Sequence, residues 1–281
     1  MTGRLVVCAT PIGNLGDASP RLAEVLRSAD VVYAEDTRRS RVLLTALDID
    51  RPLRSYFVGN EEQRSEELAG HLEAGQTVAL ITDAGMPSIS DPGVSAVSGA
   101  RRVGAEVQVV PGPSAVTAAL AVSGFDAQRF VFEGFLPRKG SERKDRLAAL
   151  ASEERTIVMF SATHRVARDL ADLASQLGTD RPVAVCRELT KRYEEVRWDT
   201  LAGAVEHLDD RGTKGEYTVV IQGGPQVVIS LDESLAEVLQ RIEAGEVLAA
   251  AVRTVATLNR VGRRVLYEAA LDATKKPLAM D

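Results

Sequence analysis

Residues 77–93 read TVALITDAGMPSISDPG, a buried strand followed directly by a long polar loop. The apolar run at 77–82 has the length and β-branched content of a strand covered on both faces. The loop at 82–93 is rich in Gly, Pro, Asp and Ser, and a plain turn rarely needs twelve such residues. This combination is typical of an open α/β sheet, where ligands bind at the carboxyl ends of strands.

Strand-like and helix-like patterns alternate around this stretch. Ser19 followed by Pro20 predicts a helix N-terminus, because serine caps helices well and proline suits the first helical position. We expect strands at residues 5–9, 31–35, 77–82 and 106–110, and helices at 20–28, 38–47, 61–73 and from Ser114 onward. This alternation predicts crossover units and a largely parallel sheet in a domain spanning residues 1–125.

The pattern changes after residue 125. Residues 130–135 are aromatic and extended, and a basic loop and a charged helix follow them. Further strands are expected at 156–160, 183–186, 195–198 and 217–221, with helices at 165–177 and 201–208. The segment 187–198 resembles a hairpin, so a second α/β domain with a mixed sheet is expected at 126–222. A linker and a helical C-terminal region, broken near Gly245 and at 259–262, fill 223–281.

Composition narrows the class of protein. The 281 residues are 45% hydrophobic and 26% charged, as in an ordinary globular chain, with no apolar run of membrane-spanning length and no secretory leader. We therefore expect a cytoplasmic protein. Cys8 and Cys186 lie in apolar runs and are expected to be buried thiols. The three histidines lack the spacing of metal ligands, so no metal is expected.

The net charge of −6 excludes a uniformly basic surface but not local basic patches. Each patch is either a contact for a polyanion or a solvated helix face, and for the C-terminal patch a packing or dimerisation element is an equal alternative. The patches are Arg138, Lys139, Arg143, Lys144 and Arg146, and, near the end, Arg253, Arg260, Arg263, Arg264, Lys275 and Lys276.

Three further loops follow strands and share the composition of 82–93. They are TPIGNLGD at 10–17, EDTR at 35–38 and VPGPSA at 110–115. None contains the glycine fingerprint of dinucleotide-binding sheets, the phosphate loop of NTPases or the nucleophile elbow of α/β-hydrolases. Four such loops in one domain favour a ligand that has several polar groups and is bound by backbone groups of the protein.

Six ordered motifs carry a resemblance to a known family. They are TPIGNLGD, AEDTR, TDAGMPSISDPG, VPGPSA, EGFLPRKG and RELTKRYEE. Together they resemble the ribosomal RNA small subunit methyltransferase I family, in the tetrapyrrole-methylase-like (class III) group of S-adenosylmethionine enzymes. The resemblance covers roughly residues 4–222 and is looser in the C-terminal helices.

The resemblance implies methyl transfer from S-adenosylmethionine to the ribose 2′-hydroxyl of a cytidine in small-subunit ribosomal RNA. It implies a homodimer that acts on this RNA or on the small subunit, with the cofactor in a cleft between two α/β domains. For three residues implied in cofactor binding, a purely structural role is the alternative: Ser114 caps a helix, Asp83 caps a turn and Phe160 belongs to the core. The residues implied in cofactor binding are Asp83, Ala84, Gly85, Ser88, Ile89, Ser114, Ala115, Phe160, Ala162, Tyr217 and Thr218.

The sequence leaves the general base open. Asp36, Glu133 and Lys139 are the catalytic candidates, with Asp91 beside them, and each needs a shifted pKa to accept a ribose proton. For Arg38 an ion pair at the helix start is the alternative to phosphate binding. The residues expected at the RNA are Asn14, Arg38, Arg138, Lys139, Arg187 and Arg192.

Two rival functions remain at this point. One is methylation of a tetrapyrrole carbon, which the basic loops disfavour because a polycarboxylate macrocycle needs no long basic track. The other is an RNA-binding assembly factor that has no catalytic activity, which the intact loops at 83–87 and 111–115 disfavour.

Overall fold

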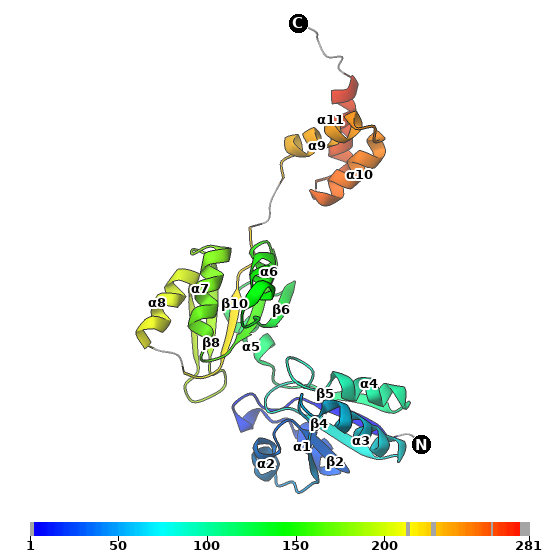
Figure 1. Cartoon of the computed structure of the whole chain (residues 1–281), viewed down its shortest axis with the longest axis vertical. Coiled ribbons are helices and arrows are strands. Elements are labelled where there is room, and N and C mark those ends of the chain that lie inside the picture. The colour runs from blue at the N-terminus through cyan, green and yellow to red at the C-terminus, as the bar shows by residue number, and fades with distance from the viewer. Residues whose placement is uncertain (1–2, 212–213, 226–228, 260, 276–281) are drawn as a thin grey trace. The chain divides into compact units, whose positions relative to one another are not determined.

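In the computed structural model, the first half of the chain forms a parallel five-stranded sheet of order β3-β2-β4-β1-β5 (Figure 1). The structure describes residues 3–211, 214–225, 229–259 and 261–275. All four strand pairings are parallel, so the carboxyl ends of the five strands lie along one edge. The strands are β1 Arg4–Cys8, β2 Val31–Ala34, β3 Leu53–Ser55, β4 Thr77–Ile81 and β5 Glu106–Val110.

Helices cover both faces of this sheet. On one face, α1 (Pro20–Ser28) and α2 (Thr37–Ala46) pack on Val6, Val32 and Ala79, and on the other, α3 (Glu61–Glu73) and α4 (Val94–Arg102) pack on their neighbours in the strands. The predicted helix start is confirmed, since Leu22 N donates to Ser19 Oγ at 3.1 Å. The short strand β3 and helix α4 were not predicted.

The second sheet has the order β6-β7-β10-β8-β9 and is mixed, as predicted. Strands β6 and β7 are parallel, whereas β10 is antiparallel to β7 and β8. The expected hairpin is the antiparallel pair β8–β9. The strands are β6 Phe130–Phe135, β7 Thr156–Ser161, β8 Pro182–Arg187, β9 Glu195–Thr200 and β10 Tyr217–Ile221.

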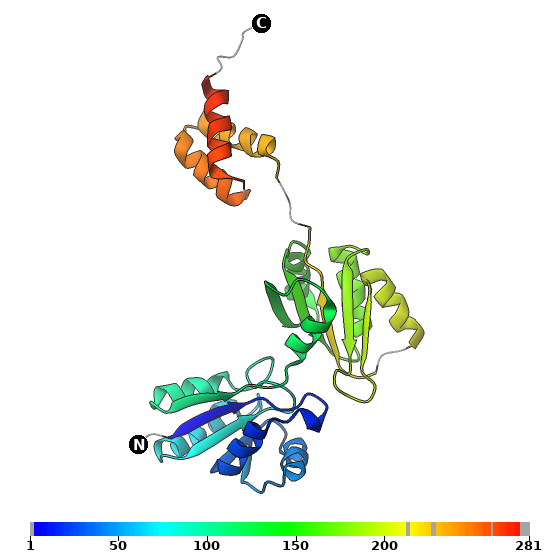
Figure 2. The same cartoon turned by 180° about the vertical axis from the view of Figure 1, so that it is seen from behind.

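Helices also cover both faces of the second sheet (Figures 1 and 2). Helices α6 (Gly140–Ala151), α7 (Val166–Leu177) and α8 (Leu201–Arg211) pack on one face. Helix α5 (Ala115–Ser123) packs on the other. By its contacts α5 belongs with the second sheet, although it precedes residue 125, where we placed the boundary between the α/β domains.

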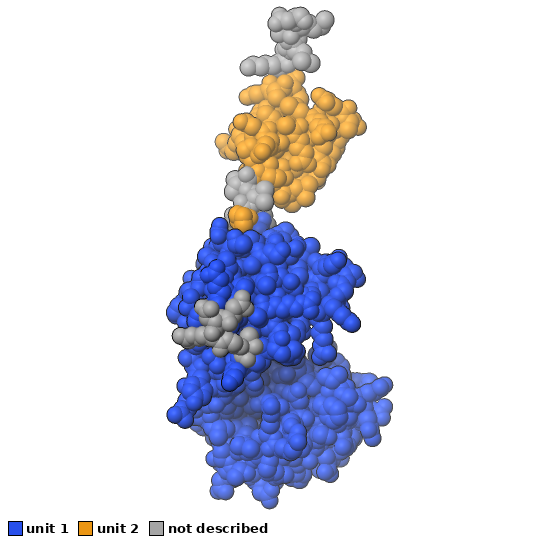
Figure 3. Space-filling model, turned by 60° about the vertical axis from the view of Figure 1, so that its left-hand side comes forward, with its two compact units in different colours: residues 1–224 blue, residues 225–281 orange. Residues whose placement is uncertain are grey.

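The chain divides into two compact units, Met1–Gly224 and Pro225–Asp281 (Figure 3). The second unit consists of α9 (Leu231–Glu243), α10 (Leu248–Leu258) and α11 (Arg263–Lys275), so the expected helical region and its breaks are confirmed. Its own core includes Val238, Val252 and Leu266. Arg260 and Lys276 of the predicted basic patch lie outside the described residues.

Both cysteines are buried and unpaired, as predicted, and burial raises the pKa of each thiol to about 12. Within the described ranges, no helix is long and apolar enough to span a bilayer. The same part of the chain holds no group of three or more His, Cys, Asp or Glu side chains placed to bind a metal ion.

Candidate functional site

A cavity of about 460 Å³ lies in the first unit, where the carboxyl-end loops of the first sheet face the second sheet. This size is within the usual range of small-molecule sites. The four loops singled out in the sequence all contribute to it, because parallel strands end at one edge. They supply Ile12, Glu35, residues 83–86 and 89–91, and the start of α5.

The loop after β4 is tied to the loop after β1 through Gly85. Thr10 N donates to Gly85 O at 2.8 Å, and Gly85 N donates to Thr10 O at 3.1 Å. Gly85 has a φ of +87°, a conformation that glycine adopts without the steric cost of a side chain. The hydroxyl of Thr10 also donates to Thr82 O at 3.1 Å, so these contacts fix the backbone that lines the cavity.

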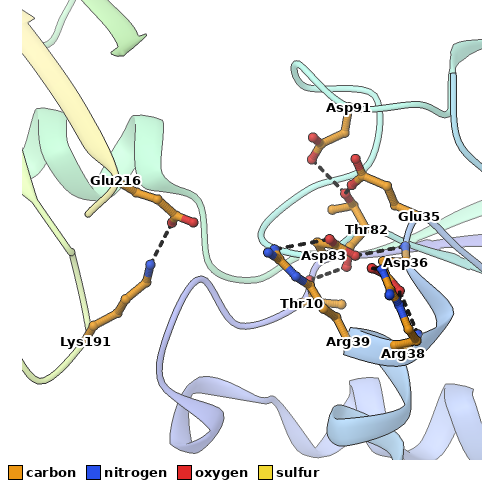
Figure 4. A network of polar contacts seen from close by, with 10 residues as sticks. All are labelled: Thr10, Glu35, Asp36, Arg38, Arg39, Thr82, Asp83, Asp91, Lys191 and Glu216. Carbon is orange, nitrogen blue, oxygen red and sulfur yellow. Dashed lines mark hydrogen bonds and ion pairs between the residues drawn. The ribbon is translucent and has the colours of Figure 1, made fainter. Parts of the chain in front are cut away.

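Two carboxyl groups share the hydroxyl of Thr82 (Figure 4). Thr82 Oγ1 lies 2.7 Å from Glu35 Oε2 and 2.8 Å from Asp91 Oδ2. A hydroxyl has a single proton, so both contacts are satisfied when one carboxyl group is protonated and donates to Thr82 Oγ1. Burial, with the neighbouring charges of Glu35 and Asp83, raises the pKa of Asp91 to about 6. Asp91 therefore takes up a proton much closer to neutral pH than an ordinary aspartate does.

Asp83 connects two loops of the same wall. Its Oδ1 accepts a hydrogen bond from Asp36 N at 3.0 Å, and its Oδ2 lies 3.3 Å from Arg39 Nη1. Burial raises the pKa of Asp83, and the hydrogen bond from Asp36 N and the charge of Arg39 oppose that rise. The carboxylate thus holds the start of α2 against the loop after β4 and also lines the cavity.

Asp36 lies outside the cavity and caps α2. Its Oδ1 accepts from Arg38 N at 2.8 Å, and the guanidinium of Arg38 pairs with both carboxylate oxygens. These hydrogen bonds to Arg38 hold the pKa of Asp36 well below its ordinary range. A base must take up a proton, so these contacts favour a structural role for Asp36 over the catalytic one proposed from the sequence. The same contacts form an ion pair at the start of α2, which was the alternative to phosphate binding for Arg38.

The wall from the second sheet includes a group of apolar side chains around Phe160. Phe160 is half-buried, and its ring lies 5.1 Å from that of Phe132 and 5.5 Å from that of Phe135, measured between centroids. Thr218 is the ladder partner of Phe160 on β10, and Leu189 completes this wall. The arrangement follows because antiparallel β7 and β10 meet at the cavity, where β7 ends and β10 begins.

Most residues predicted for the cofactor line the cavity. The exception is Ser88, whose hydroxyl is buried without a partner among the described residues and whose N donates to Pro92 O within the loop. Tyr217 contributes to the cavity lining, and it also belongs to the core on the other face of the second sheet. The lining residues that were predicted are Asp83, Ala84, Gly85, Ile89, Ser114, Ala115, Phe160, Ala162, Tyr217 and Thr218.

The catalytic candidates Glu133 and Lys139 do not line this cavity. Glu133 borders a neighbouring hollow and pairs with Arg146. Lys139 is exposed and occupies the N-cap of α6, where its side chain makes no capping bond. Asp91 is the one of the four candidates that lines the cavity.

The residues predicted at the RNA have different surroundings. Arg138 and Lys139 are exposed, and Arg192 is exposed with its guanidinium over the ring of Tyr193. Asn14 accepts from Gly16 N at 2.9 Å. Arg187 is occupied, since it donates to Lys214 O at 2.6 Å and lies 3.7 Å from Glu195 Oε2.

Several lining residues were not singled out from the sequence, among them Arg39, Leu189 and Glu216. Glu35, in the predicted loop 35–38, and Ser161, at the end of β7, follow the rule that sites form at strand ends. Glu216 precedes β10 and pairs with Lys191 at 2.8 Å across from the acidic wall (Figure 4). No sequence signal marks that ion pair.

Comparison with known proteins places this site in a family. Residues 4–205 match the sequence profile of the family described as "Tetrapyrrole (Corrin/Porphyrin) Methylases". The chain is 44% identical over 281 residues to the ribosomal RNA small subunit methyltransferase I of Mycobacterium tuberculosis, covering 98% of this chain and 97% of the relative. It is 42% identical over 273 residues to the protein of the same name from Synechocystis, covering 96% and 98%.

Solved structures with the same fold are more distant in sequence. The uroporphyrin-III C-methyltransferase of Thermus thermophilus complexed with S-adenosyl homocysteine is 21% identical, with a TM-score of 0.57 over 78% of this chain and 97% of that one. Diphthine synthase is 18% identical, with a TM-score of 0.61 over 78% and 89%. The expected fold of two α/β sheets is thereby confirmed. From the profile match and the near full-length relatives, the chain belongs to the ribosomal RNA small subunit methyltransferase I family of tetrapyrrole-methylase-like enzymes.

Proposed function

We propose that this enzyme transfers a methyl group from S-adenosylmethionine to the 2′-hydroxyl of a cytidine ribose in small-subunit ribosomal RNA. The observation that carries this proposal is the similarity, over nearly the whole chain, to relatives whose names state methylation of small-subunit ribosomal RNA. The 2′-oxygen and the cytidine come from the resemblance of the six motifs. A homodimer in the cytoplasm belongs to the same proposal.

The cavity fits the chemical groups of S-adenosylmethionine. The cofactor carries an ammonium and a sulfonium, for which the carboxylates of Asp83, Asp91 and Glu35 offer negative charge. Its carboxylate suits the first turn of α5, where Ser114 is the N-cap and makes no side-chain capping bond, so backbone N–H groups are free. The apolar wall around Phe160 suits the adenine ring.

The protein's own contribution is to position the ribose hydroxyl and to take its proton. When bound, the cofactor supplies a methyl group that is already activated on a sulfonium. Asp91 is the best-placed base, because it lines the cavity and its pKa of about 6 is close to the pH at which it must work. The carboxylate of Asp91 would take the proton of the 2′-hydroxyl while the methyl carbon passed from the sulfonium sulfur to the 2′-oxygen, with S-adenosylhomocysteine as the leaving group.

The basic groups that suit the RNA backbone are those without an acidic partner in the described residues. Arg138 and Lys139 stand exposed at the turn before α6, and Arg192 is exposed in the loop before β9. Such cations bind phosphates and fix the register of a nucleic acid without reading its sequence. Arg187 is already paired and contributes less.

The test is to map 2′-O-methyl groups in ribosomal RNA from cells with and without this protein. Purified small subunits from the cells that lack it are then incubated with the enzyme and labelled S-adenosylmethionine. The proposal expects one cytidine to lose its methyl group in the cells and to regain it in vitro. Label that appears only in uroporphyrinogen, offered in parallel, would support the tetrapyrrole alternative. Saturable cofactor binding without transfer to either acceptor would support the assembly factor.

A further inference from the structure

A second hollow opens beside the cavity, between the end of β6 and helix α6. It has a volume of about 490 Å³ and is open to solvent. Phe135 lines both this hollow and the cavity, so the two spaces share one wall. The other lining residues include Glu133, Pro137, Glu142, Asp145 and Arg146.

The residue shared by the two spaces, Phe135, has an aromatic ring that is partly exposed to solvent. The side chain of Phe135 is 51% exposed, although it leans on Phe160 with ring planes at 55°. Proteins that bind single-stranded RNA use such rings to stack bases that have left their helix. An exposed phenylalanine between a cofactor cavity and a second hollow therefore suits a nucleotide lying across it.

A β-bulge sets the positions of the two important side chains. In the pairing of β6 with β7, Phe132 faces Val158 and Phe135 faces Phe160, so β6 holds one extra residue there. Gly134, inside this bulge, has a φ of +65°. Bulges redirect side chains and are frequent beside active sites. Glu133 lies within this bulge and Phe135 directly after it, and both line the hollow.

Glu133 is buried to an unusual degree for a charged residue at an open hollow. Its side chain is 7% exposed, and its Oε1 pairs with Nε of Arg146, whose side chain is 51% exposed. In the part of the chain that the structure describes, no group bonds Glu133 Oε2. The pair thus offers a hydrogen-bond acceptor and, beside it, the remaining donors of a guanidinium.

We propose that this hollow receives the base of the target nucleotide and that Glu133 and Arg146 select cytosine over uracil. Cytosine has an amino donor at N4 next to acceptors at N3 and O2, so Glu133 accepts from N4 and Arg146 donates to the acceptors. Uracil places the O4 carbonyl where the amino group was, which sets two acceptors against each other. Glu142 and Asp145 on the rim strengthen the preference for an amino group.

This inference rests on the proposed function and gives it a specificity site. With the base beside Phe135 in the hollow, the attached ribose lies at the shared wall, and its hydroxyl reaches the cavity that holds Asp91. Glu133, a candidate base from the sequence, is then a residue that recognises the nucleobase.

The test compares small subunits assembled with RNA that carries cytidine or uridine at the methylated position. The quantity measured is kcat/KM for labelled methyl transfer to each. Wild-type enzyme should favour cytidine by roughly tenfold to a hundredfold, as expected for one good base contact. Glu133→Gln should bring the ratio close to one by raising activity on uridine, because its amide can donate to O4.

Arg146→Met is the second variant, in case Glu133→Gln does not fold. Arg146 is half exposed on α6, so its replacement should leave the fold intact. It should lower kcat/KM for cytidine about tenfold and leave uridine unchanged. Glu153→Gln breaks another Glu–Arg pair, that with Arg155 in the connection between α6 and β7, and neither residue lines either hollow. This control should keep the wild-type ratio.

The outcomes separate the two claims. If the wild type methylates cytidine and folded Glu133→Gln and Arg146→Met keep its ratio, this inference is wrong and the proposed function stands. If the wild type methylates neither RNA, the proposed function fails and this inference fails with it.

Discussion

The two walls of the cavity differ in the structural elements and the residues that form them. The wall of the first sheet consists of loops after parallel strands and carries Glu35, Asp83 and Asp91. The wall of the second sheet consists of strand ends such as Phe160 and Thr218 with their adjoining loops, and the one acidic residue among its described lining, Glu216, is paired with Lys191. The difference indicates that loops provide the charges of this site, whereas strands provide its shape.

The two walls also differ in what supports them. Behind the second wall, Asp169 accepts from Ser161 Oγ at 2.6 Å and pairs with Arg143 Nη2 at 2.8 Å. The side chains of Asp169 and Arg143 are 2% and 4% exposed. On the first wall, Asp83 pairs with Arg39, whose side chain is 69% exposed. We therefore expect the walls to respond unequally when a carboxylate is removed.

The largest effect is expected at Asp169. Asp169→Ala removes one of the two carboxylates that pair with the buried guanidinium of Arg143, which leaves the more exposed Asp172, and it also removes the acceptor of Ser161 Oγ. The free energy of unfolding of the first unit should fall by about 3 kcal/mol. Asp83→Ala breaks a pair whose guanidinium is largely exposed, and it should cost about 1 kcal/mol. Urea denaturation of both variants measures the difference. Equal losses would show that the two walls are supported in the same way.

Gly85→Val is expected to remove cofactor binding. At its φ of +87°, a side chain is strained, and two added methyl groups occupy the cavity that Gly85 lines. Affinity for S-adenosylmethionine should fall by at least tenfold, or about 1.4 kcal/mol, measured by calorimetry. Gly104→Val is the matched control, because Gly104 has a φ of +70° and open space around an added Cβ. Comparable losses in the two variants would argue against the place of Gly85 in the cofactor site.

The loops of the first wall were predictable because their composition is restricted and the parallel strands bring them together. The directions of their side chains were not. Ser88 and Ser90 have φ values of +71° and +65°, which nothing in their residue type predicts, and of the two only Ser90 lines the cavity. The sharing of Thr82 between Glu35 and Asp91 likewise depends on two loops that are distant in sequence.

The second wall was harder to predict at the residue level. The strands of its sheet were expected, but the bulge at Glu133 and Gly134 changes which side chains meet at the end of β6. Helix α4 was missed because VSAVSGARR contains β-branched residues, serines and a glycine, which are poor helix formers. It is helical because Ala96 and Ala100 pack into the core of the first sheet.

The pH dependence of stability should have opposite signs at Asp91, which lines the cavity, and at Asp36, which caps α2 outside it. The pKa of Asp91 is about 6 in the folded protein against an ordinary value of 3.8, so the folded state binds this proton more tightly. The contribution of Asp91 to the free energy of unfolding therefore falls as pH rises from about 4 to about 6. Asp91→Asn should gain stability relative to wild type across that window, with Glu35 and Asp83 as the other titrating groups nearby.

Asp36→Asn is the contrasting variant. The pKa of Asp36 lies below its ordinary value, so its carboxylate stabilises the fold at neutral pH and loses that effect only in more acid solution. This variant should therefore lose stability relative to wild type as pH rises toward 4 and stay constant above. Denaturation curves at a series of pH values check both signs. A flat difference for Asp91→Asn would mean that its carboxyl group is solvated like an ordinary one.

The smallest effect is expected at the exposed turn beside the second wall. Arg138→Ala with Lys139→Ala removes two cations without acidic partners in the described residues, so RNA binding should weaken and its logarithmic salt dependence should fall by about one to two. Filter binding across a salt series measures this slope. Arg101→Ala with Arg102→Ala is the matched control, since these residues end α4 at the edge of the sheet where the strands begin. If the control lowers the slope and the first pair does not, the RNA lies along the amino ends of the strands, and the loop-built wall is not its binding surface.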